Sequence, residues 1–269
     1  MRVLVTNDDG IDAPGLRALA RALADTGADV VVAAPSQEAS GMSAAMTAVE
    51  EDGRIVVVAH TLDGLDGVEA YGVAGSPAFI ALISARGAFG PAPDLVFSGI
   101  NRGANAGLAV LHSGTVGAAF TASDNGSRAL AVSLDVLTAG SASAASGGAA
   151  ALHLAADEQR HWWSAAAIAA DLLPALADLP EGAVLNLNVP DLPRDKIKGV
   201  RRARLARFGQ VQMAVAEVGH GYVRTTIEES GARREEGTDL ALLAEGYATV
   251  TVVRAVSELD VDLPVAGPA

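Results

Sequence analysis

The chain has 269 residues, of which half are apolar and 19% are charged, a composition that suits a globular protein with a sizeable buried core. It contains no cysteine, which excludes disulfides, thiolate metal sites and a cysteine nucleophile. The net charge of −13 argues against polymeric nucleic acid as a partner, but a small phosphorylated substrate stays open if a metal supplies positive charge locally.

The N-terminal segment predicts a strand, a helix and a second strand. Residues 2–6 are apolar, β-branched and followed at once by a polar loop, as in a buried parallel strand. Residues 14–27 begin with Pro14 and carry one apolar face, and residues 29–34 form a second buried run. No signal peptide precedes this unit, so we expect a cytoplasmic protein with no membrane partner.

The same alternation continues along the chain. We expect helices over 76–88, 115–125 and 161–179, and strands over 95–98, 129–134, 184–189 and 247–253. Residues 138–151 are rich in Ala, Ser and Gly and predict a mobile surface loop or a poorly ordered lead-in to the next helix. The alternation predicts a Rossmann-like, doubly wound α/β fold with a mostly parallel sheet.

The pattern changes after Pro190, where residues 198–229 favour strands without an intervening helix. We interpret them as a β-hairpin excursion. Residues 1–195 would form the Rossmann-like catalytic core, and residues 196–269 the hairpin, a returning strand and a C-terminal oligomerisation segment. An isolated hairpin is marginal in water, so pairing with a neighbour predicts a homodimer or tetramer. The alternative is a hairpin folded back on its own domain.

Two polar loops follow the first two strands. Asp8 and Asp9 repel each other unless a cation lies beside them, and a hard divalent metal meets that need. The alternative for either one is a cap of the helix that begins at Pro14. In the second loop, Ser40 and Ser43 offer hydroxyl oxygens, although serine is also frequent in ordinary loops.

Two more polar loops follow later strands. Residues 98–107 are rich in Gly and Asn and include Asn101, whose amide oxygen is a neutral metal ligand; the alternative is a plain turn. Residues 113–115 (Ser-Gly-Thr) precede a predicted helix, whose free N–H groups and dipole favour an anion; the alternative is a plain Ser/Thr cap. His112 beside this loop is a candidate for protonating a leaving group; the alternative is a loop histidine without a catalytic role.

Taken together, these loops resemble the SurE family, the stationary-phase survival nucleotidases. The matching strings are VLVTNDDGIDAPG at 3–15, APSQEASGMS at 34–43, PDLVFSGINRGANAG at 93–107 and SGTVGAA at 113–119. Further similar strings occupy 129–135, 185–193 and 237–251, in the family's order and over most of the chain.

The resemblance implies a Rossmann-like 5'-nucleotidase that hydrolyses nucleoside 5'- and 3'-monophosphates, with short polyphosphate as a further substrate. It implies one divalent metal ion per subunit, Mg²⁺ or Mn²⁺, with Ca²⁺ as another occupant. The implied ligands are Asp8, Asp9, Ser40 and Asn101, with the two aspartates catalytic. The implied phosphate-binding residues are Ser113, Gly114 and Thr115, and we expect Ser43 and Asn105 near the substrate.

The chain departs from the family pattern at two places, which puts specificity in question. Phe79 stands where the family has an acidic residue, and Thr121 stands near the place of a frequent Glu. The sequence leaves the nucleophile open between a metal-activated water and an aspartate. The alternative function is a non-catalytic nucleotide sensor. A haloacid-dehalogenase-type phosphatase is disfavoured because its Asp-x-Asp signature is absent.

Overall fold

A computed structural model describes residues 1–136, 157, 159–207, 211–219, 222–229 and 235–258. The strands are β1 (Arg2–Thr6), β2 (Asp29–Pro35), β3 (Glu50–Glu51), β4 (Arg54–Ile55), β5 (Val57–His60), β6 (Glu69–Val73), β7 (Leu95–Arg102), β8 (Arg128–Asp135), β9 (Val184–Pro190), β10 (Val200–Arg202), β11 (Val211–Gly219), β12 (Tyr222–Glu229) and β13 (Ala248–Val253). The helices are α1 (Pro14–Ala24), α2 (Pro77–Ala85), α3 (Gly114–Asp124), α5 (Trp162–Asp171), α6 (Leu173–Ala177) and α7 (Asp239–Ala244), with 3₁₀ turns η1 (Gly107–His112) and η4 (Arg194–Lys196).

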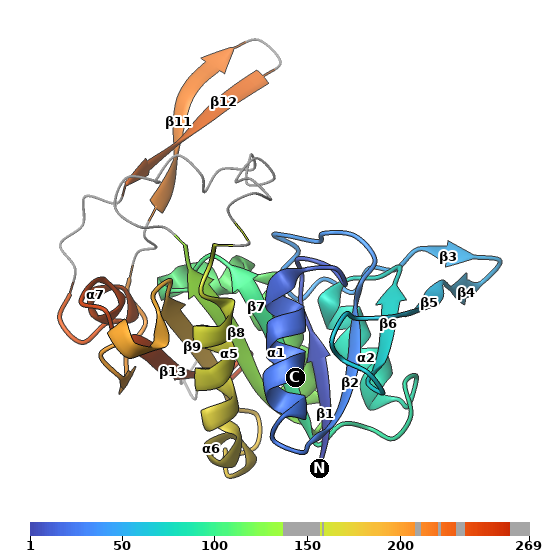
Figure 1. Ribbon diagram of the computed structural model, residues 1–269. Helices are drawn as coiled ribbons and strands as arrows, with labels where there is room; N and C mark the ends of the chain where they lie inside the picture. Colours follow the sequence, from blue (N-terminus) through green and yellow to red (C-terminus); the bar gives the residue numbers. More distant parts are fainter. Residues whose placement is uncertain (137–156, 158, 208–210, 220–221, 230–234, 259–269) are drawn as a thin grey trace, which may run out of the picture.

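Nine of these strands form one sheet with helices on both faces (Figure 1). Its order is β10-β13-β9-β8-β7-β1-β2-β6-β5. Parallel pairing joins β9, β8, β7, β1, β2 and β6 in the order in which they lie in the sheet. Antiparallel pairing occurs where β5 meets β6 and where β13 meets β9. The predicted Rossmann-like, mostly parallel α/β class is therefore confirmed.

The two faces of the sheet bury different helices. On one face, α1 and α5 pack Leu16, Leu19, Leu23 and Ile168 onto the sheet, as the apolar stripe of α1 predicted. On the other face, α2 and α3 pack mostly small side chains, with Ile80 as the largest fully buried one and Phe120 partly buried beside them. The alanine-rich helices can therefore lie close to the strands, and aromatic residues are little needed to fill the core.

Several elements differ from the sequence-based expectation. The helix expected over 161–179 is two helices, α5 and α6, separated at Leu172, because Pro174 lacks an N–H group for the helical ladder. Strand β7 continues past Ser98 to Arg102, so Asn101 belongs to a strand and pairs with Ser133 of β8. The expected loop at 138–151 lies outside the described residues.

The C-terminal part contributes to two sheets. Strands β11 and β12 form a separate antiparallel hairpin that projects from the main body (Figure 1), which confirms the predicted excursion. Strands β10 and β13 belong to the nine-stranded sheet. The domain boundary at 195/196 stays a prediction. Among the described residues, no helix has the length and apolar character needed to cross a membrane.

Candidate active site

The Asp8–Asp9 pair is the point at which the predicted loops meet. It directly follows β1, whose parallel neighbours are β2 and β7, so the loops after these strands lie at one edge of the sheet. Ala39, in the loop after β2, donates its N–H to the carbonyl oxygen of Asp8 at 2.8 Å. Arg102, at the end of β7, donates its backbone N–H to Asp9 Oδ2 at 3.2 Å.

Asp8 lies against the first turn of α3. Its side chain is almost completely buried, and Thr115 Oγ1 donates to Asp8 Oδ1 at 2.5 Å. A Cβ atom at position 114 would lie 2.7 Å from Asp8 Oδ2, so only glycine fits there. Burial raises the pKa of Asp8, although hydrogen bonds from Thr115 oppose the shift. The Asp8 carboxylate is therefore held by close packing against Gly114 and by the uncharged hydroxyl of Thr115.

Asp9 faces the charged side of the site. Burial, and then the neighbouring charge of Asp8, raise the pKa of Asp9 to about 7, while Arg102 lowers it. The two carboxylates thus disfavour being ionised together without a further cation. Within the described residues no group of three or more His, Cys, Asp and Glu side chains could hold a metal ion, so a cation here would need neutral oxygens as well.

Asn101 offers such an oxygen. Its Nδ2 donates to the carbonyl oxygen of Gly103 at 2.7 Å, and no donor from the described residues engages its amide oxygen. The buried carboxylate of Asp8, the half-buried carboxylate of Asp9 and the amide oxygen of Asn101 are hard donors of the kind that Mg²⁺ and Mn²⁺ prefer. The residues present therefore fit a hard divalent cation.

Ser40 and Ser43 lie on the loop after β2. The exposed Ser40 hydroxyl donates to Glu38 Oε1 at 2.7 Å and makes no hydrogen bond with Asp8 or Asp9. Ser43 donates to the carbonyl oxygen of Leu111 at 2.7 Å, and a Cβ atom at Gly117 would lie 2.4 Å from the Ser43 carbonyl oxygen. The structure thus brings this loop to the site through Ala39 and packs Ser43 against α3, whereas the Ser40 hydroxyl points to Glu38.

The Ser113–Thr115 segment begins α3, as predicted. The Ser113 hydroxyl oxygen accepts from the N–H of Val116 at 3.1 Å, which caps the helix, and the Thr115 hydroxyl binds Asp8. The Ser113 hydroxyl keeps its proton for an incoming anion, and the N–H of Gly114 has no acceptor among the described residues. The Ser113 side chain can therefore cap α3 and still donate a hydrogen bond to an anion.

Asn105 belongs to a polar stripe beside the site. Its Nδ2 donates to Ser133 Oγ at 2.9 Å, and its carbonyl oxygen accepts from the amides of Asn186 and Asn188 at 2.8 and 3.0 Å. Ser133 is also the register partner of Asn101. Asn105 does not contact Asp8 or Asp9, so its place is beside the pair rather than in it.

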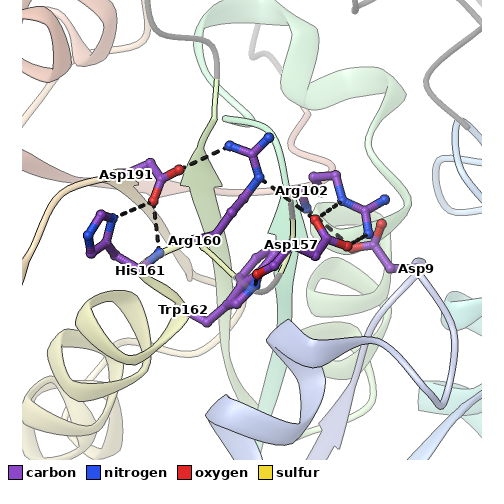
Figure 2. A network of polar contacts seen from close by, with 7 residues as sticks. All are labelled: Asp9, Arg102, Asp157, Arg160, His161, Trp162 and Asp191. Atoms are coloured by element: carbon purple, nitrogen blue, oxygen red, sulfur yellow. Dashed lines mark hydrogen bonds and ion pairs between the residues drawn. The ribbon is translucent and has the colours of Figure 1, made fainter. Parts of the chain in front are cut away.

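An ion-pair network on the Asp9 side was not expected from the sequence (Figure 2). The Arg102 guanidinium forms a two-pronged ion pair with Asp157, with Nε donating to Oδ1 at 3.0 Å. Arg160 lies 3.7 Å from Asp157 and 3.0 Å from Asp191, which also binds His161 at 2.9 Å. Asp157, the partner of Arg102, lies 55 residues further along the chain, and Asp157, Arg160 and His161 belong to no sequence motif. No local pattern could therefore reveal the network.

Within the described part of the chain, the other histidines and the two departures from the family pattern form no hydrogen bond with the aspartate pair. His112 is exposed and His60 pairs with Asp12 at 2.9 Å. Thr121 donates to the carbonyl oxygen of Gly117 at 2.9 Å inside α3, and Phe79 packs beside Gly75. Neither departure from the family pattern contacts Asp8 or Asp9.

Comparisons with known proteins agree with one another. A family model described as "Survival protein SurE" matches residues 3–212. The 5'-nucleotidase SurE of Aeromonas hydrophila is 36% identical over 93% of this chain and 91% of its own length. The 5'/3'-nucleotidase SurE of Shigella dysenteriae is 35% identical over 94% and 90%. The crystal structure of the Sure protein from Aquifex aeolicus superposes with a TM-score of 0.70 at 28% identity, covering 94% and 93% of the two chains.

Proposed function

The chain belongs to the SurE family, and from that premise we propose that it is a metal-dependent 5'-nucleotidase acting on nucleoside 5'- and 3'-monophosphates. The observation that carries the proposal is the Asp8–Asp9 pair after β1, with Asp8 buried, Asp9 half-buried and the first turn of α3 against Asp8. An isolated pair of carboxylates facing a phosphate would repel it, so the pair requires a cation.

The proposed cation site uses Asp8, Asp9 and the amide oxygen of Asn101, with Ser40 approaching from the loop after β2. When bound, a divalent ion would polarise the phosphoryl group and offset its charge. Mg²⁺ and Mn²⁺ are the proposed ions because all these donors are hard oxygens. One ion per subunit is expected, and titration calorimetry of the metal-free protein measures the stoichiometry.

The first turn of α3 is the proposed phosphate site. The N–H of Gly114 and the hydroxyl of Ser113 are the donors left for phosphate oxygens, since Thr115 is engaged by Asp8. These donors add to the positive end of the α3 dipole, which favours an anion next to the cation site.

Of the two carboxylates, Asp9 is the less closely held by the described residues. Its Oδ2 accepts one long hydrogen bond from Arg102, whereas Asp8 is engaged and closely packed. Asp9 is therefore the aspartate to test as nucleophile, with water as the alternative. A nucleoside monophosphorothioate made chiral at phosphorus and hydrolysed in isotope-labelled water separates the two: overall retention of configuration at phosphorus would identify an aspartyl-phosphate, and inversion would identify direct attack by water.

The proposal is tested by phosphate release from AMP. We expect activity to vanish in EDTA and to return with Mn²⁺ or Mg²⁺. Full activity of the metal-free protein would refute the cation site. Binding of AMP with metal but without phosphate release would instead indicate a nucleotide sensor.

We also propose that the chain assembles as a homodimer or tetramer through residues 200 to about 260. The hairpin β11–β12 projects from the body as a two-stranded sheet, which is marginal alone in water. Light scattering on dilute protein tests the assembly, and an active monomer of 27.1 kDa would refute it. Replacing residues 208–234 with a Gly/Ser bridge tests the hairpin, and it spares Ala206, which donates to Asp239 at 2.9 Å.

A further inference from the structure

Arg102 places a positive charge next to the proposed cation site. Its backbone N–H binds Asp9, so its side chain starts from the immediate neighbourhood of that carboxylate. The charges of Arg102 and Asp9 also act on each other, because each shifts the pKa of the other toward its ionised form. A guanidinium this close is a natural two-pronged partner for a carboxylate.

The guanidinium nevertheless turns to Asp157. Nε and one terminal nitrogen of Arg102 bind the two carboxylate oxygens of Asp157, and no ion pair joins Arg102 to Asp9 in the described part of the chain (Figure 2). The Asp157 side chain is only 6% exposed, and its backbone carbonyl oxygen accepts from Trp162 Nε1 at 3.0 Å. Asp157 is therefore held in place independently of Arg102.

The charges of this network balance among themselves. Arg102 and Arg160 carry two positive charges, and Asp157 and Asp191 carry two negative ones. Within the described residues, no side chain of the network forms an ion pair with Asp8 or Asp9. A buried charge without a partner is costly, so this arrangement favours a cation from solution.

We propose that Asp157 is a positioning residue for the cation site: it binds the Arg102 guanidinium and thereby keeps that positive charge off Asp9. The inference rests on the proposed function, since it concerns the affinity of the same site for its cation. If the Asp157 carboxylate is removed, Arg102 is free to pair with Asp9 and to compete with the metal.

The test measures Mn²⁺ affinity of the full-length protein by electron paramagnetic resonance of free Mn²⁺, with no turnover involved. Asp157→Asn is expected to weaken Mn²⁺ binding about ten-fold or more, as for a charge moved next to a carboxylate. Adding Arg102→Met to Asp157→Asn removes the competing charge and is expected to restore the affinity. A merely structural role of Asp157 would leave the double variant as weak as the single one.

A second pair of variants covers the case that Asp157→Asn does not fold. Arg102→Lys keeps the charge but loses the two-pronged pair, so we expect weaker Mn²⁺ binding. Arg102→Met loses the charge and is expected to bind Mn²⁺ at least as tightly as the wild type. Equal affinities of the two Arg102 variants would overturn the inference.

Asp191→Asn is the matched control, because it breaks the same network at Arg160 and His161 without releasing Arg102. Its Mn²⁺ affinity is expected to match the wild type. An unchanged Mn²⁺ affinity in Asp157→Asn, whether or not its KM for AMP is lower, would overturn the inference while leaving the proposed function intact. A wild type that binds no Mn²⁺ would overturn both.

Discussion

Asp8 and Asp9 are neighbours in the chain but lie in different surroundings. Asp8 is held by a close-packed wall in which Thr115 donates one hydrogen bond and Gly114 leaves no space for a Cβ atom. Asp9 faces Arg102 and, through it, a chain of ion pairs. One carboxylate therefore lies against close-packed backbone and the other beside a network of charged side chains, and the two sides should respond to different substitutions.

The largest expected effect follows from removing the negative charge of Asp8 or of Asp9. Asp8→Asn and Asp9→Asn should each lower kcat/KM for AMP by about 10³-fold or more, because the cation loses several kcal/mol of its attraction. Asp12→Asn is the control, since its exposed side chain lies in the same loop and pairs with His60. Near wild-type turnover in either variant would remove that residue from the site.

The second prediction tests the close-packed side alone. In Gly114→Ala the new Cβ atom would meet Asp8 Oδ2 at 2.7 Å and displace it. We expect kcat/KM to fall about 100-fold, as for a displacement of about 1 Å. Alanine is a better helix former than glycine, so the melting temperature should not fall because of α3 itself. Full activity would show that the close approach is unimportant.

The third prediction concerns the hydrogen bond on the same side. Thr115→Val leaves Asp8 without its hydroxyl donor, which costs about 1–3 kcal/mol for a buried group, and Mn²⁺ affinity should fall about ten-fold. Thr115→Ser keeps the hydroxyl and should recover most of the affinity. If vanadate inhibition weakens and Mn²⁺ affinity does not, the hydroxyl serves the anion rather than Asp8.

The smallest expected effect on activity lies at the far end of the charged side. Asp191→Asn removes charge-assisted contacts to Arg160 and His161, which contribute about 2 kcal/mol, so the melting temperature should fall by about 4–8 °C. Turnover of AMP should stay within about two-fold of wild type, since no contact reaches Asp9 directly. A large loss of turnover would mean that the ion pairs act as one unit.

The candidate site was largely predictable from local motifs. Asp8 and Asp9 follow a buried strand, and Ser113 and Thr115 begin a helix, so topology alone brings them to one edge of the sheet. The role of the Thr115 hydroxyl was not predictable, because its partner, Asp8, lies 107 residues away. Whether Ser40 binds the cation stays a prediction, since its hydroxyl is engaged by Glu38.

The sequence by itself determined the α/β class, the order of the main elements and the family, because strand and helix periodicity and loop motifs are local properties. Only the tertiary structure decided that Arg102 pairs with Asp157 and not with Asp9. It also decided that Asn105 joins Ser133, Asn186 and Asn188 beside the site. Such partners are selected by burial, since a polar group removed from water takes the donor or acceptor that the fold places within reach, whatever its distance along the chain.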